Sequence, residues 1–160
     1  MLLNYCGIGM EQQDILELID EMLMNYSLIK LMIIKDRKNK EDGIMKGVAN
    51  DAEGGGCGGI SDPTYNQAVN FMKPVEVLLL PKGKQVTNPE LWLKVICAIE
   101  KEYEGNLRAM RIFYSRFINH KTVRDIIAEE KVNQKEYEKI IYNFKWTILL
   151  IGIKEKLFIQ

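Results

Sequence analysis

Residues 121–144 read KTVRDIIAEEKVNQKEYEKIIYNF and have the most distinctive arrangement in the chain. Apolar residues recur at helical spacing on both sides of a short break, at Val123, Ile126 and Ile127 and then at Tyr137, Ile140, Ile141 and Phe144. In the break, Val132 is expected to point into the core, and Asn133 can cap the second helix with Glu136 three residues later. Two amphipathic helices joined in this way predict a helix-turn-helix at about 121–151.

The same pattern also describes many helical bundles, so the distribution of charge bears on the interpretation. The whole chain is neutral, with 22 basic and 22 acidic residues. Residues 104–160 contain 11 basic and 7 acidic residues, a net charge of +4, whereas residues 1–103 carry −4. The basic half covers the predicted helix-turn-helix, which favours DNA as its ligand.

The second helix of a helix-turn-helix can enter the major groove of DNA with its N-terminal end. Glutamine can pair there with adenine, and lysine can meet guanine or a phosphate. The candidate DNA-binding residues are Asn133, Gln134, Lys135, Lys139, Lys121 and Arg124. A solvated helix face with no ligand would show the same residues.

Upstream of this unit the chain predicts further helices. One begins at Ser61-Asp62-Pro63, a second begins at Asn88-Pro89 and a third covers 108–118. The second buries Leu91, Trp92, Val95, Ile96, Ile99 and Tyr103. Residues 75–87 are interpreted as a connector or a small hairpin.

The N-terminal third predicts a different organisation. Apolar positions from Glu11 to about Lys35 indicate one amphipathic helix, and residues 1–9, interpreted as a leader or a misassigned start, are expected to lack structure. Residues 36–59 contain seven glycines and many charges, which predicts a flexible linker. The predicted fold class is therefore all-α, with an N-terminal helix at 10–35, a Gly-rich linker at 36–60 and a helical domain at 61–160.

Several classes of protein are disfavoured by what the sequence lacks. No apolar run approaches the length of a membrane span, and three cysteines with a single histidine make a zinc site improbable. The GGGCGG run at 54–59 lacks the ending of a phosphate-binding loop. No catalytic motif is present. We expect no enzyme activity, no metal and no cofactor, in a cytosolic protein with reduced thiols.

Three segments, in order, resemble the small phage transcriptional activators of the RinA/ArpU type. Ser61-Asp62-Pro63-Thr64 with Asn66 and Ala68 is similar to that family's SDPTxNxA segment, and residues 89–96 are similar to its PExWLxVI helix. The third is the helix-turn-helix, which resembles region 4 of sigma factors. The resemblance covers about residues 61–155. It implies a phage or prophage regulator that activates late genes.

Two functional hypotheses follow. The first is a DNA-binding transcription regulator that binds double-stranded DNA, forms a homodimer and has host RNA polymerase as a candidate partner. Its helix at 10–35 would serve either dimerisation or contact with the polymerase. The second is a phage-encoded inhibitor or adaptor that uses the helix-turn-helix on a protein, supported by Glu136 and Glu138 and by the absence of arginine from residues 133–154.

Overall fold

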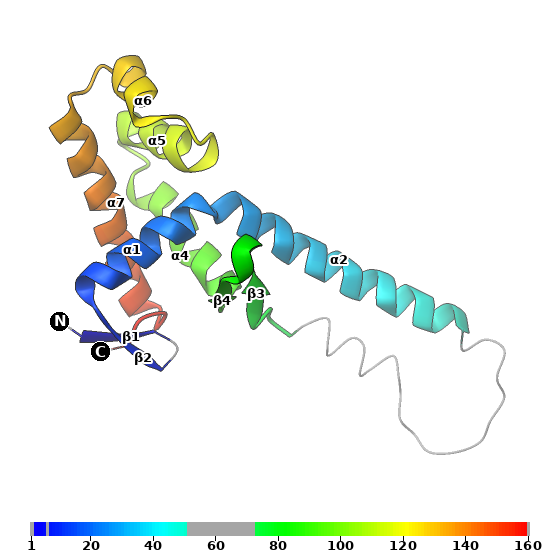
Figure 1. The fold of residues 1–160 in the computed structure, drawn as a ribbon. Helices are drawn as coiled ribbons and strands as arrows, with labels where there is room; N and C mark the ends of the chain where they lie inside the picture. The colour runs from blue at the N-terminus through cyan, green and yellow to red at the C-terminus, as the bar shows by residue number, and fades with distance from the viewer. Residues whose placement is uncertain (1, 6, 51–72, 160) are drawn as a thin grey trace.

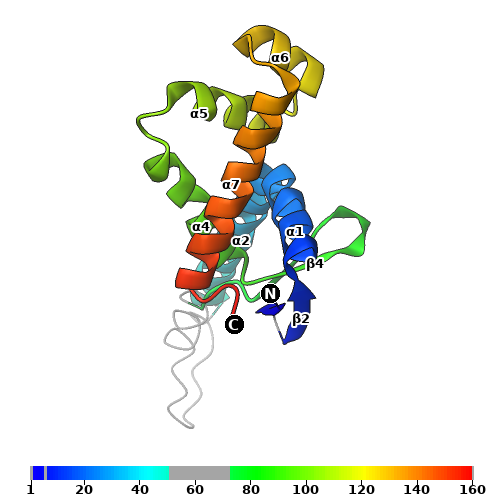
Figure 2. The same cartoon turned by 90° about the vertical axis from the view of Figure 1, so that its left-hand side faces the viewer.

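The computed structural model describes residues 2–5, 7–50 and 73–159 of the chain. Its elements in chain order are β1 (Leu2–Tyr5), β2 (Ile8–Glu11), α1 (Gln12–Met24), α2 (Tyr26–Asn50), β3 (Val77–Leu79), the 3-10 turn η2 (Pro81–Gly83), β4 (Gln85–Thr87), α4 (Pro89–Glu102), α5 (Leu107–Phe113), the π-helical turn η3 (Tyr114–Ile118), α6 (Val123–Glu130) and α7 (Gln134–Lys154). Helix α7 runs from the end formed by α5 and α6 to the end where both termini lie (Figure 1, Figure 2).

The fold is mostly helical, but the all-α prediction is wrong because the chain also forms two antiparallel hairpins. β1 pairs with β2, with Leu3 opposite Met10, and β3 pairs with β4, with Val77 opposite Thr87. The second hairpin lies where the sequence indicates a connector or small hairpin. The first occupies residues that we expected to lack structure.

Contacts with distant parts of the chain stabilise the first hairpin. The backbone of Asn4 exchanges two hydrogen bonds with Ile159, with N···O distances of 2.6 and 2.9 Å. The side chain of Leu3 is buried. Gly7 has φ +81° in the tight turn, a conformation that glycine adopts without strain. Nothing local in the first nine residues signals these partners, which explains why the sequence analysis missed the strands.

An aromatic cluster joins this hairpin to the core. The Tyr5 hydroxyl accepts hydrogen bonds from Trp92 Nε1 at 2.9 Å and from Thr87 Oγ1 at 3.0 Å, and donates to the Thr87 carbonyl at 3.2 Å. The rings of Trp92 and Phe158 meet edge to face, with centroids 5.5 Å apart. Trp92 is thus a core residue, as the sequence predicts, and its buried N–H is satisfied.

The predicted arrangement of one N-terminal helix followed by a linker is also wrong. The helix expected to reach Lys35 is interrupted at Asn25, whose side-chain Nδ2 donates to the Glu21 carbonyl at 2.8 Å. The next helix, α2, then continues to Asn50 through most of the expected linker. Charged residues are good helix formers and isolated glycines cost only about 1 kcal/mol each, so neither ends a helix already begun. Residues 51–60 of the linker, and the helix expected from Ser61, lie outside the described residues.

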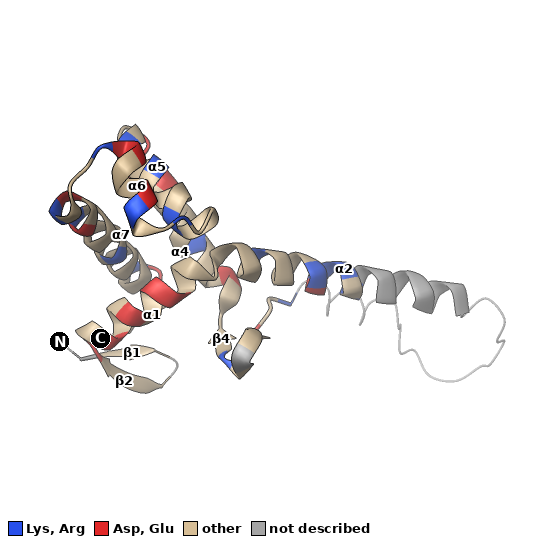
Figure 3. Cartoon of the chain, turned by 45° about the horizontal axis from the view of Figure 1, so that its top comes forward, with Lys and Arg blue, Asp and Glu red and all other residues tan. Residues whose placement is uncertain are grey.

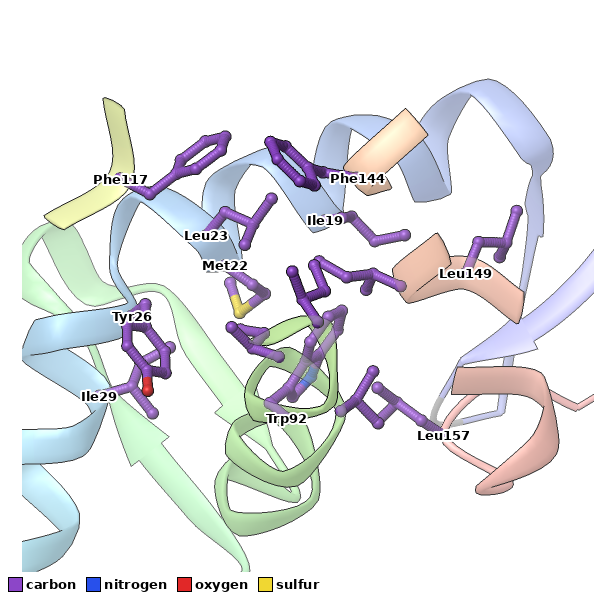
Figure 4. Packing of buried hydrophobic residues seen from close by; sticks show 14 of the residues in the cluster. Ile19, Met22, Leu23, Tyr26, Ile29, Trp92, Phe117, Phe144, Leu149 and Leu157 are labelled. Atoms are coloured by element: carbon purple, nitrogen blue, oxygen red, sulfur yellow. The ribbon is translucent and has the colours of Figure 1, made fainter. Parts of the chain in front are cut away.

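One core unites the N-terminal and C-terminal helices. Helix α1 packs against α7, and α2 packs against α4. Figure 4 shows the buried side chains that meet between these helices, among them Ile19, Met22, Leu23, Trp92, Phe144 and Leu149. An ion pair between Asp20 and Lys145, at 2.9 Å, also links α1 to α7. The N-terminal helices are therefore part of the main fold.

The C-terminal residues fold back on α7 and close this core. Lys156 has φ +61°, and the amides of Leu157 and Phe158 both donate to the Gly152 carbonyl, at 2.8 and 3.2 Å. The ring of Phe158 lies so close to Gly152 that a Cβ there would be 2.6 Å from two ring carbons. Gly152 is thus required by close packing.

Candidate nucleic-acid interface

The turn between α6 and α7 is built as the sequence predicts. Asn133 accepts a hydrogen bond on Oδ1 from the Glu136 amide at 2.8 Å, which caps α7. Thr122 caps α6 in the same way, accepting from the Asp125 amide at 3.2 Å. Lys131 ends α6 with φ +52°. The Lys131 amide donates to the Ile127 carbonyl, so local hydrogen bonds fix the α6 end of the turn as well as its α7 end.

A small hydrophobic cluster holds the two helices at this turn. Its buried members are Ile112 of α5, Ile126 of α6, and Val132 and Tyr137 of the turn and α7. Burial raises the pKa of the Tyr137 phenol; Asp20 also raises it, and Arg116 opposes the shift. Because Val132 is buried between the helices, the first turn of α7 is left at the surface, as expected.

The six candidate residues fall into two groups. Asn133, Gln134, Lys135 and Lys139 lie within the first two turns of α7, and all four are exposed. Lys121 and Arg124 lie at the beginning of α6, which is eight residues long. Helix α6, about 12 Å long, leads from Lys121 and Arg124 to the turn before α7. The α7 residues are therefore neighbours at one helix start, and the other two follow the chain at the far end of α6.

Hydrogen bonds and ion pairs distinguish the candidates further. Gln134 donates from Nε2 to Glu138 at 2.6 Å, and Lys121 is paired with Glu129 at 2.7 Å. Within the described ranges, Lys135, Lys139 and Arg124 have no hydrogen bond or ion pair through their side chains. The two lysines of α7 are thus the free cations of its first turns.

The sequence analysis did not select two arginines of α5 that lie against this unit. Arg111 binds both carboxylate oxygens of Glu130 through Nε, at 3.0 Å each, and Arg108 lies 3.5 Å from Glu136. Their i, i+3 spacing one helix before the predicted unit was the available signal. Figure 3 shows basic and acidic residues interleaved over α5, α6 and the start of α7, whereas α1 carries only acidic ones. These pairs attach α5 to the turn and neutralise part of the basic charge.

A stacked aromatic pair also lies on the exposed side of α7. The rings of Tyr142 and Trp146 are 6.3 Å apart and nearly parallel, at 12°. Tyr142 is half exposed. Counting along the helix, Lys135, Lys139, Tyr142 and Trp146 follow one another at i, i+4, i+7 and i+11, so they share one face.

Other single residues have the following positions. His120 is exposed after η3, with φ +51°. The Cys97 thiol lies 3.3 Å from the hydroxyl of Tyr26, whose pKa is raised above its ordinary value by burial and by this contact. In the described part of the chain, no three His, Cys, Asp or Glu side chains gather as metal ligands would. None of the helices in that part has both the length and the hydropathy that crossing a bilayer requires.

No protein-family model, curated protein or solved structure matches this chain.

Proposed function

We propose that the chain is a DNA-binding transcription regulator that contacts duplex DNA with the first two turns of α7. The observation that carries the proposal is the pair Lys135 and Lys139, which are exposed on one face and have no ion pair with any residue that the structure describes. Local caps and the small hydrophobic cluster hold this face outward, so a ligand meets a preformed surface. Such a surface fits a polyanion, because ammonium groups that are already paired contribute little to phosphate binding.

The biological setting is part of the same proposal. The resemblance to the RinA/ArpU-type activators supports a phage or prophage regulator of late genes, acting in the bacterial cytoplasm. We infer a homodimer, because two-fold symmetric proteins read paired half-sites. Leu31 and Ile34 of α2, both more than half exposed, offer an apolar surface for the second copy or for host RNA polymerase.

A protein-binding adaptor is the second candidate, and two observations favour it. Four glutamates, Glu129, Glu130, Glu136 and Glu138, lie around the turn and would repel phosphates. The half-exposed Tyr142, stacked on Trp146, is the type of side chain that protein interfaces enrich. In this account the helix-turn-helix contacts a protein and the lysines remain solvated.

A salt titration of binding to a random duplex separates the two candidates. For a DNA reader, log K should fall linearly with log salt, with a slope of about −0.9 for each phosphate contact. If both lysines contact phosphates, Lys135→Ala combined with Lys139→Ala should reduce that slope by about two units. Lys30→Ala, which removes an exposed lysine from α2, is the matched control and should leave the slope unchanged. Absence of duplex binding at low salt would reject the regulator in favour of the adaptor.

A further inference from the structure

The first turns of α7 hold two amide side chains that could read adenine, but both are engaged within the protein. Adenine recognition by Asn or Gln uses the side-chain carbonyl and amino group together, on N6 and N7. In Asn133 the carbonyl oxygen accepts the Glu136 amide as the helix cap. In Gln134 the amino group donates to Glu138 at 2.6 Å. In this structure neither presents both halves of its amide to a base.

The side chains that remain available at this face are donors. Lys135 and Lys139 are exposed, and no ion pair engages them within the described residues. A lysine ammonium has three donors and no acceptor. In the major groove guanine presents two adjacent acceptors, N7 and O6, whereas adenine presents one acceptor beside a donor. A face that only donates therefore matches guanine better than adenine.

Glu138, which directly precedes Lys139 in the sequence, has the hydrogen-bonding preference complementary to that of the lysines. Glu138 is exposed on the same side of α7, one turn after Lys135. A carboxylate only accepts, and the cytosine N4 amino group is the donor that a glutamate can meet in the major groove. A lysine and a glutamate together thus offer a donor for the guanine and an acceptor for the cytosine of a G·C pair.

We propose that α7 selects duplexes containing G·C pairs at its contact, with Lys135 and Lys139 on guanine and Glu138 on cytosine. This inference rests on the proposed DNA-binding function and adds the class of sequence that the site takes. In this proposal the amide of Asn133 holds the start of α7, and the amide of Gln134 holds the carboxylate of Glu138 in position.

The test compares poly(dG·dC) with poly(dA·dT) at the same salt, using the full chain and fluorescence anisotropy. We expect the G·C duplex to bind at least about fivefold more tightly, the lower end of what one good base contact contributes. A G·C duplex containing 7-deazaguanine lacks the N7 acceptor and keeps its base pairing. It should lose most of this preference.

Variants assign the preference to the named side chains. Lys135→Ala with Lys139→Ala should bind both duplexes with similar affinity, while Lys135→Arg with Lys139→Arg, which keeps the donors, should retain the preference. Lys30→Ala is the control for loss of charge elsewhere, and circular dichroism verifies that the alanine variant remains helical. Equal binding of the unaltered chain to both duplexes would overturn this inference and leave the proposed function intact. Binding to neither would overturn both.

Discussion

The two hydrophobic clusters of this chain differ in how far apart their members lie in the sequence. The larger draws on residues from Leu3 to Phe158, so it is completed only when both ends of the chain meet. The smaller, at the helix-turn-helix, needs only residues between Ile112 and Tyr137. Ile140 and Ile141 pack against both clusters. The smaller cluster thus shapes the surface proposed to read DNA, and the larger cluster fixes its orientation relative to the rest of the fold.

This difference predicts that a destabilising substitution in the larger cluster lowers the stability of the whole fold. Trp92→Ala removes a fully buried ring and the donor to the Tyr5 hydroxyl, so it should lower the free energy of unfolding by about 3–5 kcal/mol. Urea unfolding followed by circular dichroism measures this. Trp92→Phe keeps most of the ring and should lose clearly less. A loss under about 1 kcal/mol for the alanine variant would show that Trp92 does not organise the core.

Damage to the smaller cluster should remain local. Ile126→Ala leaves three buried partners around a cavity and should destabilise α6 and the start of α7 by about 2–3 kcal/mol. Amide hydrogen exchange should accelerate there, while α4 keeps its protection. Ala128→Gly, at an exposed position of α6, is the control for helix propensity. Equal loss of protection in both regions would show that the two clusters form one cooperative unit.

Closure of the larger cluster by the C-terminus can be tested with a single methyl group. In Gly152→Ala the added Cβ would lie 2.6 Å from the Phe158 ring, so the C-terminal residues must shift, at about 1–3 kcal/mol. Thermal unfolding measures the effect. Gly105→Ala provides a matched control, because a Cβ there meets nothing within 4 Å. If both variants have the same stability, the contact of Phe158 with α7 is not a fixed part of the fold.

The smallest expected effect is at alkaline pH, where one tyrosine reports on each cluster. Burial raises the pKa of Tyr26 in the larger cluster and of Tyr137 in the smaller one. Each phenol ionises more easily when unfolded, so its contribution to stability is complete below pH 10 and is lost as the pH rises above it. Tyrosinate absorbance, compared with that of Tyr26→Phe and Tyr137→Phe, should show both phenols ionising above pH 10 in the folded protein. Ionisation of either phenol at its ordinary pH would contradict its burial in the cluster.

The same distinction between short-range and long-range contacts explains which elements could be predicted from the sequence. Helices α4, α6 and α7 and the Asn133 cap were predictable because their signals, apolar period and capping residues, lie within a few positions. Strand β1 was not, because the partners of Tyr5 are 82 and 87 residues away. The exposure of Lys135 and Lys139 could be predicted from helical spacing. The hydrogen bond between Gln134 and Glu138 could not be predicted, since helical spacing places the two residues one turn apart but does not fix the rotamers that they adopt.

The backbone bridge between Asn4 and Ile159 has a consequence for synthesis of the protein in the cell. A chain emerges from the ribosome N-terminus first, so β1 and its hairpin partner β2 are made early, whereas the backbone bridge of Asn4 can form only after Ile159 has been made. The helix-turn-helix can assemble before that moment, because its contacts are short-range. Without the contacts of Leu157 and Phe158 the larger cluster stays open, although all members of the smaller cluster have already been made.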